Sequence, residues 1–532
     1  MNDKALNEQG LSVLSDEMKD YIDEKIAESG GTTEKEYWVR VVDYDGTVLD
    51  FKGIDDTETY TLPTAPSHTG LVFQCWSSNE TITNNTITCN KNNIMVGAIY
   101  TTASGLNEFD IEINKAIAPD IENTPYTLYL NMDFTEVDWG DGTSYLDYNK
   151  HTYTAYGKYT IKCDGTAFEP TNHNIFYDKE HSTQPSVCCT AIRLATVEAI
   201  TPYAFDGINS LKTITLSESV QDIKESCFRY CANLQAVVIP PITDLDGFLD
   251  IGANVFRYCA NLKEVVLPKN LYSLGNYCFS ENSLLNHIAL SDTFGGFGTY
   301  CFNFCYSLTE IIIPHLTGSA VIPQACFYYC VNLKKVILPD NLTSFGQQAF
   351  TYCVSLEKIT LPNSFNGSNA QNIFQYCYNL KSLIIPANAT TLGTFLPNCR
   401  SLESLTILGS GTLLAQNTLT SASSLKTLII SSPRMTGING NFGTYFYALK
   451  TIKFPPNLTS VSSSSNNSYY SLELLDFRDA VAVPTNDSNA GFNQMPKSAK
   501  IVVPDSLYTT WITATNWVDL AGMIYKASEV TL

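Results

Sequence analysis

The sequence predicts an α+β protein of several domains: an N-terminal helix, two small β domains, and a β-rich repeat solenoid with a C-terminal cap. Three observations support this fold class. Residues 4–28 carry apolar side chains at helical spacing, residues 36–168 contain alternating strand patterns, and residues 200–480 repeat a phrase that first reads FRYCANL. A chain of 532 residues is long enough for three or four domains.

Residues 1–35 are expected to form an amphipathic helix and a Gly/Thr linker. The apolar side chains recur at steps of three and four, as on one helix face; they are Leu11, Leu14, Met18, Ile22 and Ile26. This face has two possible uses. It could pack on the next domain, or it could serve in oligomerisation (for example as a homotrimer) and in attachment to a larger assembly. The phrase LNEQGLSVLSDEMKDYIDEKI resembles the N-terminal segments of tail-fibre and related virion proteins of gut bacteriophages. The acidic start has no hydrophobic run, so no secretory signal is expected.

Residues 36–118 are predicted to form a small β domain. YWVRVVDYDGTVLDF is an alternating strand, a turn at Asp45-Gly46 and a second strand. This segment resembles the β-grasp-like repeats of the Listeria–Bacteroides type found in bacterial and phage surface proteins. The family usually has Gly before its tryptophan, whereas Cys75 precedes Trp76 here. The resemblance implies that the module is a spacer.

Residues 119–168 contain a second β module. WGDG at 139–142, with HTY and GKYT further on, resembles the turn and strand pair of a PKD-type immunoglobulin-like domain. Asp138, Asp141 and His151 could form a metal or acid–base cluster, but we expect the carboxylates to cap turn amides instead. Residues 169–199 are then a linker and the N-terminal cap of the solenoid.

Residues 200–480 repeat about every 23 residues, with steps of 22–25 and one of 28 between equivalent leucines. Such a period is typical of a solenoid, in which each unit buries its apolar face only against its neighbours. In Leu262-Lys263-Glu264-Val265-Val266-Leu267, the alternation predicts a strand with Leu262, Val265 and Leu267 pointing inward. Phe256, Cys259 and Leu262 stand three apart, which predicts a short helical or 3₁₀ segment on the opposite wall.

This pattern resembles the BspA-like (treponemal-type) leucine-rich repeats, with about 12 copies here. Residues 481–532 would form the C-terminal cap, because an atypical end unit must cover the open core. Seven repeat cysteines stand three residues before the repeat leucine, and we expect them to be a reduced, buried ladder rather than disulfides or metal ligands; they are Cys231, Cys259, Cys305, Cys330, Cys353, Cys377 and Cys399.

Composition argues against several functions. Residues 1–199 hold 13 basic and 32 acidic residues, a net charge of −19, whereas residues 200–480 hold 16 and 17, a net charge of −1. A nearly neutral array lacks the basic surface that nucleic-acid binding requires, and no apolar run is long enough to span a membrane. The sequence has no catalytic signature that names a reaction. We therefore expect no enzyme activity, no cofactor and no metal.

The candidate binding residues lie in two columns of the repeats. An aromatic residue precedes a ladder cysteine six times. Either this column faces outward as a binding ribbon, or it is a stacked ladder that closes the solenoid wall. Outward strand positions add three lysines. The candidate ligand-binding residues are Tyr230, Tyr258, Phe304, Tyr329, Tyr352, Tyr376, Lys334, Lys358 and Lys381.

Three functions follow from these resemblances. The first is a bacteriophage tail-fibre or other receptor-binding component of the virion, attached to other virion proteins through its N-terminal segment. Its array would bind a host cell-surface protein or glycan. The second is a BspA-like adhesin at the surface of a bacterial cell. The third is a head-decoration or structural virion protein.

Overall fold

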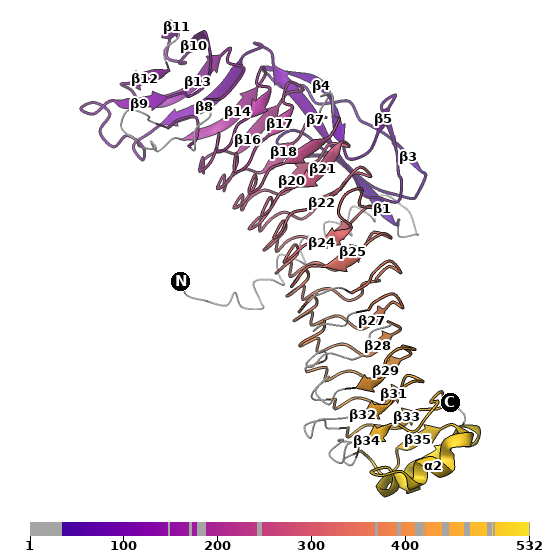
Figure 1. Ribbon diagram of the computed structural model, residues 1–532. Coiled ribbons are helices and arrows are strands. Elements are labelled where there is room, and N and C mark those ends of the chain that lie inside the picture. Colours follow the sequence, from indigo (N-terminus) through magenta and orange to yellow (C-terminus); the bar gives the residue numbers. More distant parts are fainter. Residues whose placement is uncertain are drawn as a thin grey trace.

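A computed structural model describes residues 35–146, 149–169, 173–177, 188–241, 247–367, 371–390, 395–409, 419, 421–438, 446–461, 469–486, 492 and 495–530. Together they form a curved rod, with β sheets at the N-terminal end and a helix at the C-terminal end (Figure 1). The protein is mostly β rather than α+β. Within the described residues, α2 (Tyr508–Thr513) is a helix of six residues, and the other helical segments are short 3₁₀ turns.

The first sheet has the strand order β2-β1-β7-β4. The hairpin predicted around Asp45-Gly46 is confirmed, and Gly46 has the positive φ of 87° that a tight hairpin turn uses. A small sheet of β3, β6 and β5 lies beside it. The strands are β1 (Tyr37–Val42), β2 (Val48–Ile54), β3 (Thr59–Thr61), β4 (Leu71–Ser78), β5 (Ile82–Thr83), β6 (Thr86–Thr88) and β7 (Ile94–Thr102).

The second sheet joins the next β module directly to the solenoid. Its order is β11-β10-β13-β8-β14-β16, so β8 pairs with β13 on one side and with β14 on the other. A separate pair is formed by β12 and β9. The strands are β8 (Asn107–Ile113), β9 (Tyr126–Tyr129), β10 (Glu136–Asp138), β11 (Ser144–Leu146), β12 (Lys150–Tyr153), β13 (Gly157–Cys163) and β14 (Cys189–Leu194).

The solenoid has about 13 turns. Its main ladder of parallel strands follows the repeat leucines, and the predicted inward side chains Leu262, Val265 and Leu267 are buried. The main-ladder strands are β16 (Thr213–Leu216), β18 (Ala236–Val238), β20 (Glu264–Val266), β23 (Glu310–Ile312), β25 (Lys335–Ile337), β27 (Ser382–Ile385), β28 (Ser404–Ile407), β29 (Thr427–Ile430), β31 (Thr451–Lys453), β33 (Leu474–Asp476), β35 (Lys500–Val503) and β36 (Ile524–Lys526).

Shorter strands form a second parallel ladder on another side of each turn. Each of these strands follows the main-ladder side of its turn along the chain and pairs in parallel with the equivalent strand of a neighbouring turn. These strands are β15 (Ala199–Ile200), β17 (Asp222–Ile223), β19 (Leu249–Ile251), β21 (Leu271–Leu274), β22 (Gly296–Phe297), β24 (Val321–Ile322), β26 (Ser344–Phe345), β30 (Gly437–Ile438), β32 (Ser460–Val461) and β34 (Thr485–Asn486).

The wall between the ladders is built of turns, so the helical or 3₁₀ segment predicted for Phe-x-x-Cys is wrong. In one repeat, Cys259 N–H bonds to Phe256 O at 3.2 Å and Leu262 N–H bonds to Cys259 O at 2.9 Å. Asn254 and Tyr258 have φ values of 57° and 65°. These left-handed residues reverse the chain at four-residue intervals, and a continuous helix cannot form through them.

Two internal ladders fill the core behind this wall. Phenylalanine rings of successive turns stack face to face, for example Phe302 on Phe327 with centroids 5.5 Å apart and Phe327 on Phe350 at 5.2 Å. The predicted cysteine ladder is confirmed as buried free thiols. Each ladder thiol also lies within hydrogen-bonding distance of a phenylalanine carbonyl in the preceding turn, as Cys330 Sγ does 3.2 Å from Phe302 O.

The C-terminal end of the core is closed by two tryptophans. Trp511 on α2 and Trp517 beside it are fully buried, and both rings contact Phe477 of the last turns. The remaining short segments here are η2 (Asp505–Leu507), η3 (Val518–Met523) and η4 (Ala527–Glu529). One continuous hydrophobic core therefore runs from β8 to β36.

Candidate functional site

The six aromatic residues that precede the ladder cysteines form one column on the turn wall, which we call the aromatic ribbon. The rings fall into two groups, because Glu281 holds the ribbon position between Tyr258 and Phe304. Tyr230 stacks on Tyr258 with centroids 4.7 Å apart. In the second group Tyr329 stacks on Tyr352 at 4.1 Å, and Tyr352 stacks on Tyr376 at 4.4 Å. Phe304 contacts Tyr329 at 5.1 Å. The sequence left open a stacked ladder or an outward surface, and the structure combines both, because Tyr230 is 44% exposed and the other rings are half-buried.

The ribbon stands on a backbone that does not favour aromatic residues. All six have φ between 60° and 65°, a left-handed conformation that costs a side chain with Cβ about 1–2 kcal/mol. Hydrogen bonds between turns hold it in place, such as Tyr329 N–H to Thr351 O at 2.9 Å. The same column holds Asn398 and Ser421 further along, so small polar residues are accepted where the rings are absent.

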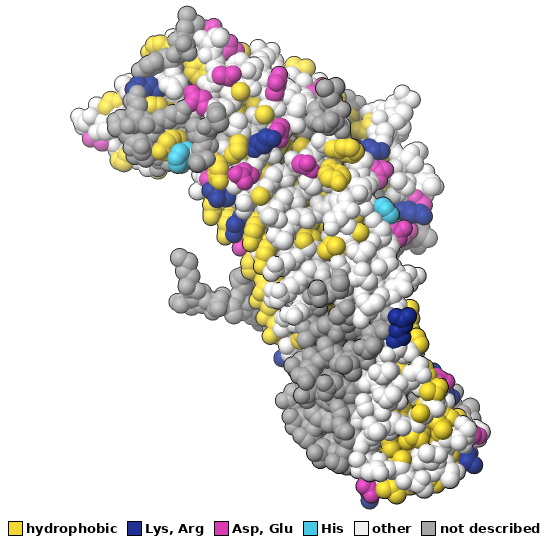
Figure 2. All heavy atoms as spheres, viewed as in Figure 1, with side chains coloured by type: hydrophobic (Ala, Val, Ile, Leu, Met, Phe, Trp, Pro, Cys, Tyr) yellow, Lys and Arg dark blue, Asp and Glu magenta, His cyan; other side chains and the backbone are white. Residues whose placement is uncertain are grey.

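Stacking determines which part of each ring a partner can reach. Within the ribbon, the face of one ring is covered by the next, so the exposed parts are ring edges and hydroxyl groups. Figure 2 shows many hydrophobic side chains along the upper left edge of the rod, where the turns of Figure 1 lie. The ribbon is thus a narrow apolar line with a hydroxyl rim.

The candidate lysines belong to a different surface. Lys334, Lys358 and Lys381 are exposed on the strand side of the solenoid, which we call the strand face, and the ribbon lies on the turn wall. Lys381 Nζ lies 3.5 Å from a carboxylate oxygen of Glu357 on the preceding turn. Exposed pairs of this kind contribute little to stability. The structure therefore brings the aromatic candidates together and leaves the lysines apart from them.

The candidate attachment residues of the N-terminal helix lie outside the described residues. They are Leu11, Leu14, Met18, Ile22 and Ile26.

Residues 37–102, which hold β1–β7, pack on the strand face, and we call them the docked module. The outward side chains of successive turns are apolar where the module lies; they are Val238, Val266, Ala289, Ile312 and Ile337. A Cβ on Gly97 of β7 would stand only 2.5 Å from Val238 Cγ1, so β7 approaches the solenoid as closely as glycine permits. In Figure 1, β1, β7 and β4 lie across the first turns of the rod.

Buried polar contacts fix the orientation of the docked module. Arg40 on β1 forms a bidentate ion pair with Glu264 on β20, with Nε at 3.0 Å and Nη2 at 2.5 Å from the carboxylate. The indole N–H of Trp38 bonds to Glu310, and Asn92 Nδ2 donates to Leu290 O at 2.6 Å. The segment for which the sequence predicts a spacer thus covers strands β16 to β25.

Farther along the rod, the strand face is exposed. Lys358 stands at the first turn beyond β25, and Ile384 on β27 is 57% exposed. Sequence reasoning did not anticipate this division into a covered and an open half. The available signal was the second outward position of the strands, which is apolar from Val238 to Ile337 and becomes Thr360 in the next turn.

His287 gives the docked interface a pH dependence. It lies edge-on to Trp38, 5.3 Å between centroids, and burial, with a smaller effect of the charge on Arg40, lowers the pKa of His287 from 6.5 to about 3. In the unfolded chain His287 binds a proton below about pH 6.5, whereas in the folded chain it stays neutral down to about pH 3. The contribution of His287 to stability is therefore lost as the pH falls through this range.

We expect the free energy of unfolding to fall by about 2 kcal/mol through His287 between pH 6.5 and pH 5. Burial raises the pKa of Glu264 more than Arg40 lowers it. Glu264 therefore has the opposite effect on the free energy of unfolding, which it lowers as the pH rises and the buried carboxylate must ionise. Denaturant unfolding of wild type and of His287→Gln at several pH values isolates the histidine. An equal pH dependence in both proteins would contradict the assignment.

The WGDG turn is structural, as expected. Asp138 Oδ1 accepts from Gly140 N–H at 2.9 Å, and Asp141 Oδ1 accepts from Thr143 N–H at 3.1 Å. Asp141 Oδ2 lies 2.8 Å from His151 Nε2, and the His151 ring stacks on buried Trp139. Across the residues that the structure describes, no group of three His, Cys, Asp or Glu side chains could hold a metal ion.

No helix in the same part of the chain has the length and apolar character to cross a membrane.

Comparison with protein families decides how the repeats are classified. The family described as "BspA type Leucine rich repeat region" matches six copies, over residues 185–248, 249–370 and 368–492. These matches cover more than half of the chain. The chain belongs to the BspA-type leucine-rich repeat family.

A solved leucine-rich repeat structure shares the fold of this chain. A leucine-rich repeat protein from Bacteroides ovatus is 18% identical, with a TM-score of 0.50, and the match covers 75% of this chain and 98% of that one. A leucine-rich cell surface protein from Faecalibacterium prausnitzii is 17% identical, with a TM-score of 0.32 and coverage of 59% and 89%. Comparison with curated protein sequences finds no significant match.

Proposed function

We propose that this BspA-type protein is a non-enzymatic adhesin that acts at the surface of a bacterial cell and binds a protein partner through the aromatic ribbon. The observation that carries the proposal is the ribbon itself. Six aromatic rings occupy left-handed backbone positions where asparagine would cost less, and Asn398 does hold the same position in a later turn. Half-exposed aromatic rings kept at that cost are typical of a contact surface.

The geometry of the ribbon favours a protein over a glycan as its partner. A sugar ring stacks on an open aromatic face, but in the ribbon these faces are covered by neighbouring rings. Ring edges and hydroxyls remain, and they suit the mixed apolar and hydrogen-bonding contacts of a protein interface. A line of repeated contacts also gives multipoint binding on a rigid support.

A bacteriophage tail fibre remains a second candidate. Its support is the sequence at 6–26, which resembles the N-terminal segments of virion proteins. The ribbon would then face the host bacterium, while the N-terminal segment would attach to other virion proteins. The PKD-type and Listeria–Bacteroides-type resemblances fit either an adhesin or a tail fibre.

Replacing Tyr329, Tyr352 and Tyr376 by asparagine tests the ribbon without straining its backbone, because asparagine tolerates the left-handed conformation. We expect binding of fluorescently labelled protein to cells to weaken by about tenfold or more, the effect of losing central aromatic contacts. Titrating the protein on human epithelial cells and on gut bacteria separates an adhesin from a tail fibre. Trypsin treatment of the cells should abolish binding if the partner is a protein.

The matched control replaces three exposed tyrosines outside the ribbon by asparagine: Tyr145, Tyr447 and Tyr470. This variant loses the same number of rings and should bind like wild type. Equal binding by both triple variants would refute the ribbon as the contact surface. Circular dichroism and thermal unfolding confirm that both variants are folded.

A further inference from the structure

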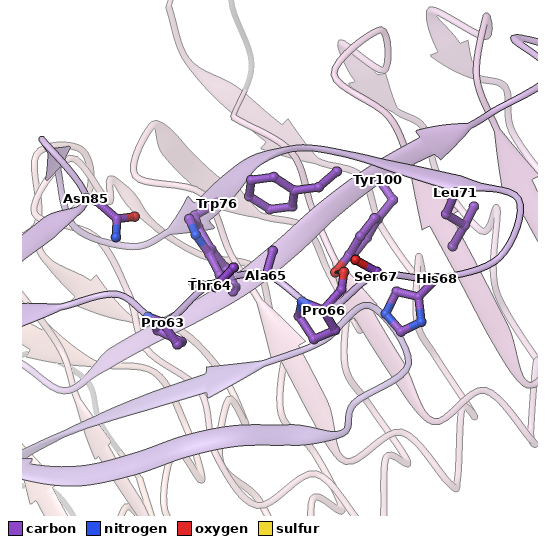
Figure 3. Close-up of a pocket in the computed structure, with 11 residues that line it drawn as sticks. Pro63, Thr64, Ala65, Pro66, Ser67, His68, Leu71, Trp76, Asn85 and Tyr100 are labelled. Atoms are coloured by element: carbon purple, nitrogen blue, oxygen red, sulfur yellow. Dashed lines mark hydrogen bonds between the residues drawn. The ribbon is translucent and has the colours of Figure 1, made fainter.

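The docked module contains a cleft of ≈ 370 Å³ on the side of its sheet that faces away from the solenoid contacts. One wall is the segment 63–68, which reads PTAPSH and links β3 to β4. The opposite wall comes from β4 and β7, through Trp76 and Tyr100 (Figure 3). Phe73 of β4 also lines it. Its volume lies at the lower end of the range of about 300–1,000 Å³ for small-ligand sites.

The aromatic rings of the cleft are arranged differently from those of the ribbon. Phe73 is 36% exposed and meets Trp76 and Tyr100 edge to face, with centroids 5.4 and 5.7 Å away. Tyr100 is buried, and its hydroxyl donates to Pro66 O at 3.0 Å, which ties the two walls of the cleft together. Phe73 and Trp76, which is only half-buried, therefore keep ring surface open to the cleft, whereas Tyr100 supports them from below.

Neutral polar groups surround these rings. Thr64 and Ser67 have side-chain hydroxyls that make no hydrogen bond in the part of the chain that the structure describes, and Asn85 uses only its Nδ2, which donates to Leu62 O at 2.9 Å. The lining contains no Lys, Arg, Asp or Glu. His68 is held from behind by buried Asp43, with Nε2 2.7 Å from Oδ2.

We propose that this cleft binds a neutral pyranose of a glycan. An aromatic platform offers its face to the C–H surface of a sugar ring, and hydroxyl and amide groups at the rim exchange hydrogen bonds with the sugar hydroxyls. The lining has no Lys or Arg to pair with an anionic ligand, and a cation, which could bind to the aromatic faces, is tested directly with choline below. This site is separate from the ribbon and does not depend on the function proposed for it.

The test is saturation-transfer NMR of the full-length protein with maltose, cellobiose, lactose and chitobiose, followed by titration of any sugar that binds. We expect at least one neutral sugar to bind in the millimolar range that is common for a single small site. Phe73→Ser removes the exposed ring and should weaken that binding by about tenfold. Choline and glucuronate, as a cation and an anion of similar size, should give no transfer.

The matched control is Val72→Ser, one residue earlier on β4. Val72 is 51% exposed and does not line the cleft, so this variant should bind sugar like wild type. The proposal is overturned if no sugar of the panel binds, if choline or glucuronate binds instead, or if Phe73→Ser and Val72→Ser bind sugar equally well. Cell binding through the ribbon is measured in a different experiment. A negative result for the sugar site therefore does not contradict the ribbon proposal, and a negative result for the ribbon does not contradict the sugar site.

Discussion

Replacing Arg40 by methionine should destabilise the docked module by about 3–5 kcal/mol, the usual result of removing one partner from a buried ion pair. Glu264 is buried, and its carboxylate has Arg40 as its bidentate partner. Without the guanidinium, the carboxylate must either stay charged in an apolar interface or take up a proton. Hydrogen exchange of the β1 and β20 amides should therefore accelerate, while the turns beyond β28 keep their wild-type protection.

Two further variants separate the ion pair from general damage. Glu264→Gln combined with Arg40→Met removes the orphaned charge and should restore a large part of the lost stability. Lys381→Met breaks an exposed pair, whose lysine and glutamate side chains are 62% and 58% exposed, and should change stability by less than about 1 kcal/mol. If Arg40→Met were as mild as Lys381→Met, the contact between module and solenoid would not depend on this ion pair.

Phe327→Ala should cost about 3–5 kcal/mol, because it opens a cavity in the middle of the phenylalanine ladder. The ring is fully buried between Phe302 and Phe350, and Phe297 meets it edge-on at 5.7 Å. Since each solenoid turn contacts only its neighbours, the damage should stay local. Hydrogen exchange should accelerate in the turns next to Phe327 and remain unchanged near Trp511.

Phe327→Leu is the control for volume. Leucine fills most of the space and should cost less than about 2 kcal/mol. If alanine and leucine were equally tolerated, the ladder would contribute little to stability. If instead the alanine variant lost protection along the whole rod, the turns would unfold as one cooperative unit rather than as a chain of neighbours.

The repeat pattern was sufficient to predict the solenoid because its information is local. Leu262, Val265 and Leu267 alternate within one strand, and Cys259 recurs at the same place in turn after turn. Any fold that buries these residues together must stack the turns in register. The structure of the turn wall was harder to predict, because spacing by three suits a 3₁₀ helix and a succession of turns equally well, and only the φ of residues such as Tyr258 distinguishes them.

The docked module could not be placed from sequence because its contacts join residues far apart in the chain, 224 positions in the case of Arg40 and Glu264. Arg40 and Glu264 are ordinary charged residues when each is considered alone. The cleft has the same difficulty, since Phe73 and the segment 63–68 meet only after the sheet has formed. The ribbon residues, in contrast, were identified correctly as one column because they share a repeat position, but whether they are a contact surface is still a prediction.

The thiol ladder also affects how the protein survives outside a reducing compartment. All sixteen cysteines are free, and fourteen are buried; burial raises the pKa of core thiols such as Cys330, which suppresses the reactive thiolate. Once the chain unfolds in an oxidising medium, the same thiols become accessible and can pair wrongly. Refolding would then be blocked, so the working life of the protein would depend on how slowly it unfolds rather than on its equilibrium stability.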